Sequence, residues 1–177
     1  SACLICARTF PVVVDTILAL ITGNSESLDV ARADGLAATM AQLVPILEWR
    51  DGAFSIVERI ILEDPYLKGT DLNAFLDLAS ASDPRDLELR KDIIQMMLKL
   101  AYAHPGVRSE LRFGWLHQAV NMIADLALAS DSTWGEKLRL AEMLVTFICL
   151  GMASSETHRS GFWAGPGATG LARAFEA

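Results

Sequence analysis

The residues best suited to metal or redox chemistry are three cysteines and three histidines, and their spacing supports neither. Cys3 and Cys6 are separated by two residues, as in a redox dithiol or one half of a zinc site. A structural zinc site needs four ligands, usually in two close pairs, and neither Cys149 nor any histidine supplies a second pair. A thioredoxin-like motif also needs a strand before a helix, which this stretch lacks. We therefore interpret Cys3 and Cys6 as small apolar residues on one helix face, and we expect no metal and no cofactor.

The histidines and the carboxylates also lack the arrangement of a catalytic site. His104 precedes Pro105 in an expected turn, and His117 lies in an apolar helical stretch. Adjacent carboxylates such as Glu63 and Asp64 point in different directions on a helix. The sequence has no Glu-x-x-His pair of the kind that builds a di-iron site in a helical bundle. We therefore predict no catalytic residues and a protein that is not an enzyme.

Gly165, Gly167 and Gly170 have the G-x-G-x-x-G spacing of a dinucleotide-binding turn. That turn needs a strand before it, a full helix after it and an acidic residue about 20 positions further on. None of these is predicted, because the preceding sequence is polar and Gly-rich and the sequence stops at Ala177. We expect a helical repeat-like domain over residues 1–159 and a Gly-rich C-terminal tail over residues 160–177, with a short terminal helix.

Aromatic and arginine side chains are the residues best placed to bind a partner. Trp and Arg are enriched at the energetic centres of protein interfaces because they combine a large contact area with polar groups. Four aromatic and arginine residues fall within eight positions, and we predict that they form a partner-binding surface: Arg108, Arg112, Phe113 and Trp115. The alternative is that each tryptophan fills a junction between stacked helical units.

The composition is that of an acidic and apolar chain. Hydrophobic residues make up 52% of the 177 residues, and the net charge is -7 at pH 7. The mean hydropathy is +0.32. Basic residues are scattered, which disfavours nucleic acid as a partner. No apolar run reaches the roughly 18 residues of a membrane helix, so we expect no membrane span. The odd number of cysteines, without a secretory signal, favours a reducing, cytoplasmic location.

Apolar residues recur at helical spacing along most of the chain. This periodicity predicts an all-α fold of about seven helices, near residues 4–22, 28–48, 53–63, 71–81, 86–103, 108–129 and 135–151. Capping signals agree with it. Thr133 and Glu136 have the spacing of a capping box, and Asp83 precedes a proline at an expected helix start. Gly151 lies where a helix is expected to end.

One short segment occurs twice, which indicates an internal repeat. The sequence of Asp77–Asp83 returns as Asp125–Asp131, 48 residues later, with six of seven positions identical. Each copy is predicted to end one apolar helix and to precede a longer amphipathic helix. A pair of helices cannot bury its own apolar faces, so such pairs stack and share one elongated core.

This layout, from about Leu28 to Gly151, resembles the armadillo/HEAT class of helical repeats. Residues 98–101 and 148–151 resemble the end of the third helix of an armadillo unit. Peptide-binding members of that class commonly have an asparagine in this segment, whereas this chain has Lys99 and Cys149 at the matching positions. The resemblance implies a short α-solenoid of stacked antiparallel helices that binds proteins, without the extended-peptide groove of importins and catenins.

These observations leave two functions open. The first is a protein–protein interaction or scaffolding module with an unidentified protein partner. A homodimer is also considered, because so apolar a chain can hide part of its surface in a dimer. The alternative function is a compact helical bundle that binds a small apolar ligand, including the case of an uncharacterised enzyme. Met96, Met97 and Met122 would then line an adaptable pocket.

Overall fold

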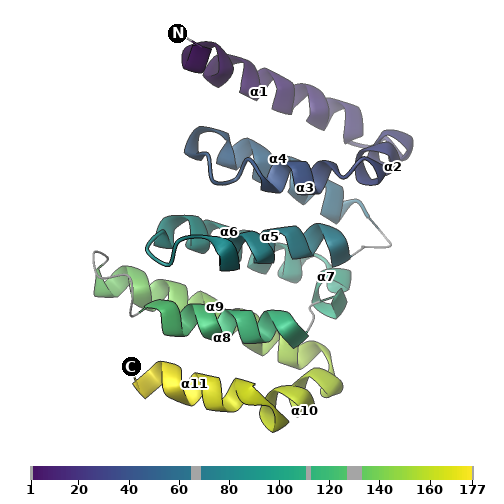
Figure 1. The fold of residues 1–177 in the computed structure, drawn as a ribbon. Coiled ribbons are helices and arrows are strands. Elements are labelled where there is room, and N and C mark those ends of the chain that lie inside the picture. Colours follow the sequence, from purple (N-terminus) through teal and green to yellow (C-terminus); the bar gives the residue numbers. More distant parts are fainter. Residues whose placement is uncertain (1, 65–68, 111–112, 127–132, 177) are drawn as a thin grey trace. The chain divides into compact units, whose positions relative to one another are not determined.

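The computed structural model describes residues 2–64, 69–110, 113–126 and 133–176, and all regular structure within these ranges is helical (Figure 1). The all-α prediction is confirmed. The described ranges form eleven helices rather than about seven, because two of the expected helices are divided and two further helices follow the last expected one. The chain divides into two compact units, Ser1–Ala74 and Phe75–Ala177. Within the same ranges, no helix is both long enough and apolar enough to cross a membrane.

The first unit has an apolar core around one central helix. Its described residues form four complete helices, α1 (Ala2–Ile21), α2 (Ser25–Ala33), α3 (Leu36–Ala41) and α4 (Leu47–Leu62). The α4 helix packs against α1 and α3, and α2 contacts the other three. Gly52 allows α1 and α4 to approach closely, because a Cβ atom at this position would lie 2.8 Å from side-chain atoms of both Phe10 and Val14.

The helix expected over residues 28–48 is instead α2, α3 and the beginning of α4. Gly35 separates α2 from α3 with a φ of 69°, in the left-handed region that favours glycine. Asn24 caps the start of α2, where its side chain accepts a hydrogen bond from the backbone N–H of Ser27 at 3.1 Å. Apolar residues continue at helical spacing on both sides of Gly35. The periodicity therefore predicted one continuous helix, although the turn at Gly35 separates two helices.

The described residues of the second unit form the end of α5 and six further helices. The α5 helix (Gly69–Ala81) crosses the division between the units, and the others are α6 (Leu87–Ala103), α7 (Pro105–Glu110), α8 (Phe113–Asp125), α9 (Trp134–Ser154), α10 (Glu156–Ala164) and α11 (Pro166–Glu176). The α9 helix packs against α6 and α8, and α8 also packs against α11 (Figure 1). The α7 helix contacts α6 and α9, and the α10 helix contacts α8, α9 and α11. The helix expected over residues 108–129 is thus α7 and α8.

Two helix starts in the second unit can be compared with the predicted caps. The capping box is confirmed, since Thr133 Oγ1 accepts a hydrogen bond from the Glu136 N–H at 3.3 Å and the Glu136 carboxylate accepts one from the Thr133 N–H at 2.8 Å. The α6 helix, however, is capped by Asp86, whose side chain accepts a backbone hydrogen bond at 3.0 Å. Asp83 instead accepts a hydrogen bond from the N–H of Arg85 in the preceding turn.

The segment expected to be a Gly-rich tail with a short terminal helix is helical over most of its described length. It forms α11 and most of α10. Two of its glycines are points of close packing: a Cβ atom at Gly167 would lie 2.6 Å from the ring of Phe162, and one at Gly170 would lie 2.8 Å from Val120 on α8. The missing side chains at these two positions therefore allow helices to touch, whereas the sequence pattern alone suggested a Gly-rich tail.

Gly151 has the same role inside α9, where a helix end was predicted. The α9 helix continues to Ser154, and a Cβ atom at Gly151 would lie 2.5 Å from Leu116 on α8. This close approach marks the place where α8 and α9 cross. The first copy of the repeated segment lies at the end of α5 and is fully described. Residues 127–131 of the second copy lie outside the described ranges, so the two copies can be compared only in part.

Candidate functional site

An apolar groove lies on the first unit where α1 meets α2. It has a volume of about 420 Å³, and its described lining consists of Ile17, Leu20, Ile21, Glu26, Ser27, Val30, Ala31 and Leu36. Ile21 is buried beneath it, whereas Leu20 and Val30 are 58% and 56% exposed. Single exposed apolar residues are common, but adjacent ones around a hollow are typical of contact surfaces. We call this feature the α1–α2 groove.

The exposed apolar surface continues from the groove along α1. Val13, Ile17 and Leu20 follow one another at intervals of four and three residues, so they lie on one face of the helix. Val13 is exposed and Ile17 is half-buried, while Val14 and Ile21 belong to the core. The α1 helix thus has two apolar faces, and the face through Val13 is the one open to solvent.

The charge at the groove is acidic. Glu26 is the one charged residue in the described lining, and it is exposed. Asp34 is also exposed and lies two positions before the groove residue Leu36. These two carboxylates place negative charge beside an apolar surface.

The arginines described in residues 9–64 are engaged elsewhere. Arg32 lies 3.1 Å from the carboxylate of Asp29 and 3.3 Å from that of Asp64. Arg50 is buried, and its Nε donates a hydrogen bond to a backbone carbonyl at 3.0 Å. Arg59 forms an ion pair with a neighbouring glutamate at 2.9 Å. These cations therefore leave the acidic groups at the groove uncompensated.

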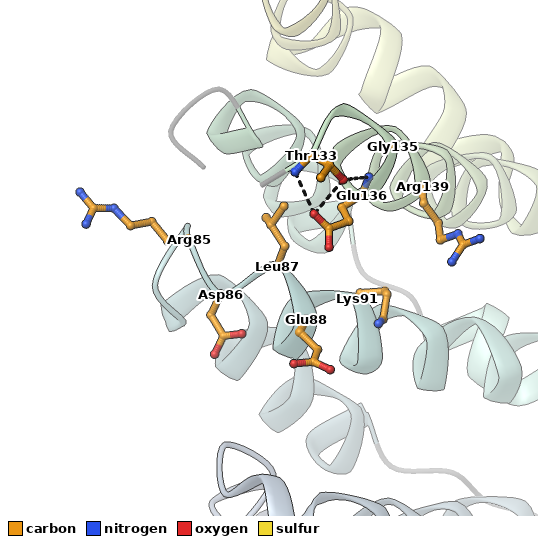
Figure 2. A pocket seen from close by; sticks show the side chains of 9 residues that line it. All are labelled: Arg85, Asp86, Leu87, Glu88, Lys91, Thr133, Gly135, Glu136 and Arg139. Atoms are coloured by element: carbon orange, nitrogen blue, oxygen red, sulfur yellow. Dashed lines mark hydrogen bonds between the residues drawn. The ribbon is translucent and has the colours of Figure 1, made fainter. Parts of the chain in front are cut away.

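A second hollow lies on the second unit between the beginnings of α6 and α9 (Figure 2). Its volume is about 670 Å³, and its described lining consists of Arg85, Asp86, Leu87, Glu88, Lys91, Thr133, Gly135, Glu136 and Arg139. Figure 2 shows Arg85 and Arg139 at opposite ends, with the three carboxylates between them. We call this hollow the α6–α9 cleft.

Two of the three carboxylates in the α6–α9 cleft are already bonded to helix starts. Asp86 caps α6, and the Glu136 carboxylate accepts hydrogen bonds from the N–H and Oγ1 of Thr133 at 2.8 and 2.9 Å. These bonds from Thr133 lower the pKa of Glu136 below its ordinary value of 4.5, and the positive charge of Lys91 acts in the same direction. Because the described lining of the cleft has three basic and three acidic side chains, the charge of these residues favours no single class of ligand.

The four residues predicted to bind a partner do not form an exposed surface in the described part of the chain. Trp115 is 4% exposed, so it is a core residue and the predicted exposed position is wrong. Arg108 is half-buried, and its Nη1 donates a hydrogen bond to the carbonyl of Ala101 at 2.6 Å, near the end of α6. Arg112 and the side chain of Phe113 lie outside what the structure describes.

The burial of Trp115 follows from its register on α8. Ala119 and Met122, four and seven positions later, are also buried, so all three lie on the packed face of the helix. The exposed tryptophans are instead Trp134 and Trp163, at 77% and 61%. The sequence placed all four tryptophans near helix ends or loops, and this position alone does not distinguish a core residue from a surface one.

The residues considered for redox, metal or catalytic chemistry are dispersed. Cys149 is exposed on α9, and Cys3 and Cys6 belong to α1 with side chains outside the described set. The Nδ1 atom of His104 accepts a backbone hydrogen bond at 3.0 Å, and the ring of His117 lies 6.2 Å from a phenylalanine ring. Among described residues, no three His, Cys, Asp or Glu side chains are grouped so that they could hold a metal ion.

Comparison with known proteins gives no relative from which a function could be transferred. No protein-family model, no curated protein and no solved structure matches this chain. The surfaces of the two units are therefore the basis on which a function can be proposed.

Proposed function

We propose that this chain is a protein-interaction or scaffolding module of the armadillo/HEAT type that binds a helical segment of a partner protein in the α1–α2 groove. The observation that carries the proposal is the pair of largely exposed side chains, Leu20 and Val30, beside one hollow. Each Å² of apolar surface removed from water contributes roughly 25 cal/mol. Binding of a partner that covers these two side chains is therefore favourable, because it removes their apolar surface from water.

A helix is the partner geometry that this surface favours. Val13, Ile17 and Leu20 form a row along α1, and Val14 and Ile21 lie on its packed face. Helices pack by placing such rows into the grooves between rows of a neighbour. A partner helix on the exposed row would add one element to the unit, as a further helix does in a helical repeat.

The assignment to a helical-repeat stack is supported by sequence and packing together. The segment Asp77–Asp83 recurs as Asp125–Asp131, and in the second unit α6, α9, α8 and α11 contact one another in that order. Such serial contacts are expected of stacked repeats, in which each element contacts its neighbours. The positions of Lys99 and Cys149 still argue against the asparagine-based peptide groove of importins and catenins. We place the module in a reducing compartment, as the odd number of cysteines favours.

The alternative of a small apolar ligand has less support. Met96, Met97 and Met122, which were expected to line its pocket, are buried core residues. The larger hollow, the α6–α9 cleft, is lined mainly by charged side chains, which bind apolar molecules poorly. Protein binding through the α1–α2 groove therefore has the stronger physical basis.

The test compares the proteins that bind the wild-type chain with those that bind a Leu20→Asp variant. Leu20 is 58% exposed, so an aspartate there is solvated and the fold should be retained. A charge within the groove should weaken a groove-bound partner at least about tenfold. Proteins captured by the wild-type chain but not by the variant are identified by mass spectrometry, purified, and measured by titration calorimetry.

Val12→Asp is the matched control for this test. Val12 is on the same helix and is 63% exposed, but it does not line the groove. Circular dichroism and thermal unfolding establish that both variants keep the helical fold. Equal affinity of the purified partners for wild type and Leu20→Asp would overturn the proposal.

A further inference from the structure

We infer that the occupant of the α1–α2 groove is an amphipathic helix whose apolar face is flanked by lysine or arginine. This inference rests on the proposed function and adds the chemical class of the partner. Its physical basis is the distribution of charge around the groove. The apolar lining provides affinity for any apolar helix, and the charges at the edge select among such helices.

The first step concerns the charges closest to the groove. Glu26 lines it, and Asp34 lies two positions from Leu36, another lining residue. Both are exposed, and no ion pair involves either of them among the described residues. Charges separated by more than about 8 Å are largely screened at physiological salt, and Glu26 belongs to the lining itself, so its carboxylate contributes negative potential at the groove. A cation beside the apolar face of a bound helix would meet an unpaired carboxylate.

The second step concerns the charge of the whole first unit. Residues 1–74 contain five basic and ten acidic residues, which gives a net charge of -5. The described arginines among them are already bonded: Arg32 to Asp29 and Asp64, and Arg59 to Glu63. Arg50 is buried. The unit therefore attracts basic segments over a longer range at low salt and repels acidic ones.

The same charges decide between a basic helix and the other occupants of an apolar groove. A second copy of this chain would bring Glu26 and Asp34 of one groove toward the same residues of the other, and like charges at an interface are unfavourable. Nucleic acids and anionic membranes are repelled for the same reason. A helix with basic flanks pairs with these carboxylates and also covers Leu20 and Val30.

The experiment selects helical peptides from a displayed library. Every member has the same leucine positions on one helix face, and the positions beside that face are randomised among Lys, Arg, Glu, Asp, Gln and Ser. Selection is made on the full chain, and peptides that also bind Leu20→Asp are removed. We expect the retained peptides to be enriched in Lys and Arg, and the best of them to bind at least about tenfold more tightly than a synthetic version with Glu at the same positions.

Two charge variants sharpen the measurement. Glu26→Lys should abolish the preference for basic over acidic flanks, whereas Glu48→Lys should leave it unchanged. Both residues are exposed and both lie in the first turn of a helix, so the two variants change net charge and helix-end electrostatics alike. Only Glu26 lines the groove. The preference should also decrease as salt is raised from 50 to 300 mM, about a two- to threefold change in screening length.

The outcomes separate this inference from the proposed function. Retained peptides with neutral or acidic flanks would overturn the inference and leave the proposed function standing. A library without any binder that depends on Leu20 would count against both. Self-association of the chain that Leu20→Asp abolishes, measured by sedimentation, would identify a second copy as the occupant and would overturn the basic helix.

Discussion

The guanidinium group of Arg90 lies 3.4 Å from the carboxylate of Asp125, which joins the beginning of α6 to the end of α8 within the second unit. The side chain of Arg90 is 1% exposed and that of Asp125 is 37% exposed. Arg90 also donates hydrogen bonds to the carbonyl and hydroxyl oxygens of Ser82 at 3.0 and 3.1 Å. Ser82 belongs to the first copy of the repeated segment and Asp125 begins the second, so one buried cation contacts both copies.

Removal of this cation should destabilise the protein. Arg90→Ala leaves the Ser82 oxygens without their donor and creates a cavity, and we expect a loss of about 2–4 kcal/mol in the free energy of unfolding. Asp125→Asn should cost less, about 1 kcal/mol, because the carboxylate is partly solvated. Urea titration followed by circular dichroism measures both. Arg85→Ala, at an exposed arginine of the preceding turn, is the control and should change stability by less than about 0.5 kcal/mol.

The capping box at α9 should contribute measurably to stability. Thr133→Ala removes the hydroxyl that accepts the Glu136 N–H, and loss of an N-cap side chain typically costs about 1 kcal/mol. Thr133→Ser keeps the hydroxyl and should retain most of that stability. Thermal and urea unfolding of the two variants provide the measurement, and equal stability of the two would contradict a capping role.

The lowered pKa of Glu136 predicts a pH-dependent contribution. A carboxylate with a lower pKa in the folded state stabilises that state at pH values above its unfolded pKa, and the contribution is lost as the pH falls through the folded pKa. The melting temperature of wild type should therefore exceed that of Glu136→Gln at pH 7, and the difference should shrink toward pH 3. Glu142→Gln, at an exposed glutamate on the same helix, is the matched control for the change from Glu to Gln.

The close approach of α8 and α9 predicts opposite effects at two glycines of one helix. Gly151→Ala introduces a methyl group 2.5 Å from Leu116, and overpacking of about 1–3 kcal/mol should exceed the helix-propensity gain of up to about 1 kcal/mol. Gly135→Ala has no neighbouring atom within 4 Å, so only the gain remains and stability should rise slightly. Denaturant midpoints of the two variants test this. A stabilised Gly151→Ala would show that the crossing has room.

The tryptophans should divide into core and surface residues. Trp115→Ala should lower the free energy of unfolding by about 3–5 kcal/mol, as expected for a buried aromatic residue, whereas Trp134→Ala should change it by less than about 0.5 kcal/mol. Acrylamide quenching distinguishes them independently, since the Trp134 indole is 77% exposed. A Trp115→Ala variant with wild-type stability would restore this residue as a surface candidate.

The sequence by itself determined the helical character of the chain and several helix ends. The predicted segments 86–103 and 135–151 correspond to Leu87–Ala103 and Trp134–Ser154, and the Thr133–Glu136 cap was predicted with its partner. These features depend on interactions within a few residues, because helical periodicity and caps are local. The acidity of residues 1–74 is likewise a property of composition alone.

The tertiary structure decided which apolar residues are covered. Trp115 and Leu20 both lie on apolar helices. Trp115 is buried because it lies on the face of α8 that packs against other helices, whereas Leu20 is exposed because it lies on a face of α1 that no other described helix covers. In the sequence, Gly151 indicated a helix end and Gly167 belonged to an expected Gly-rich tail, but each lies within a helix and close to the side chain of another helix. Burial and close approach depend on segments distant in sequence, so local patterns could predict the helices but not the α1–α2 groove.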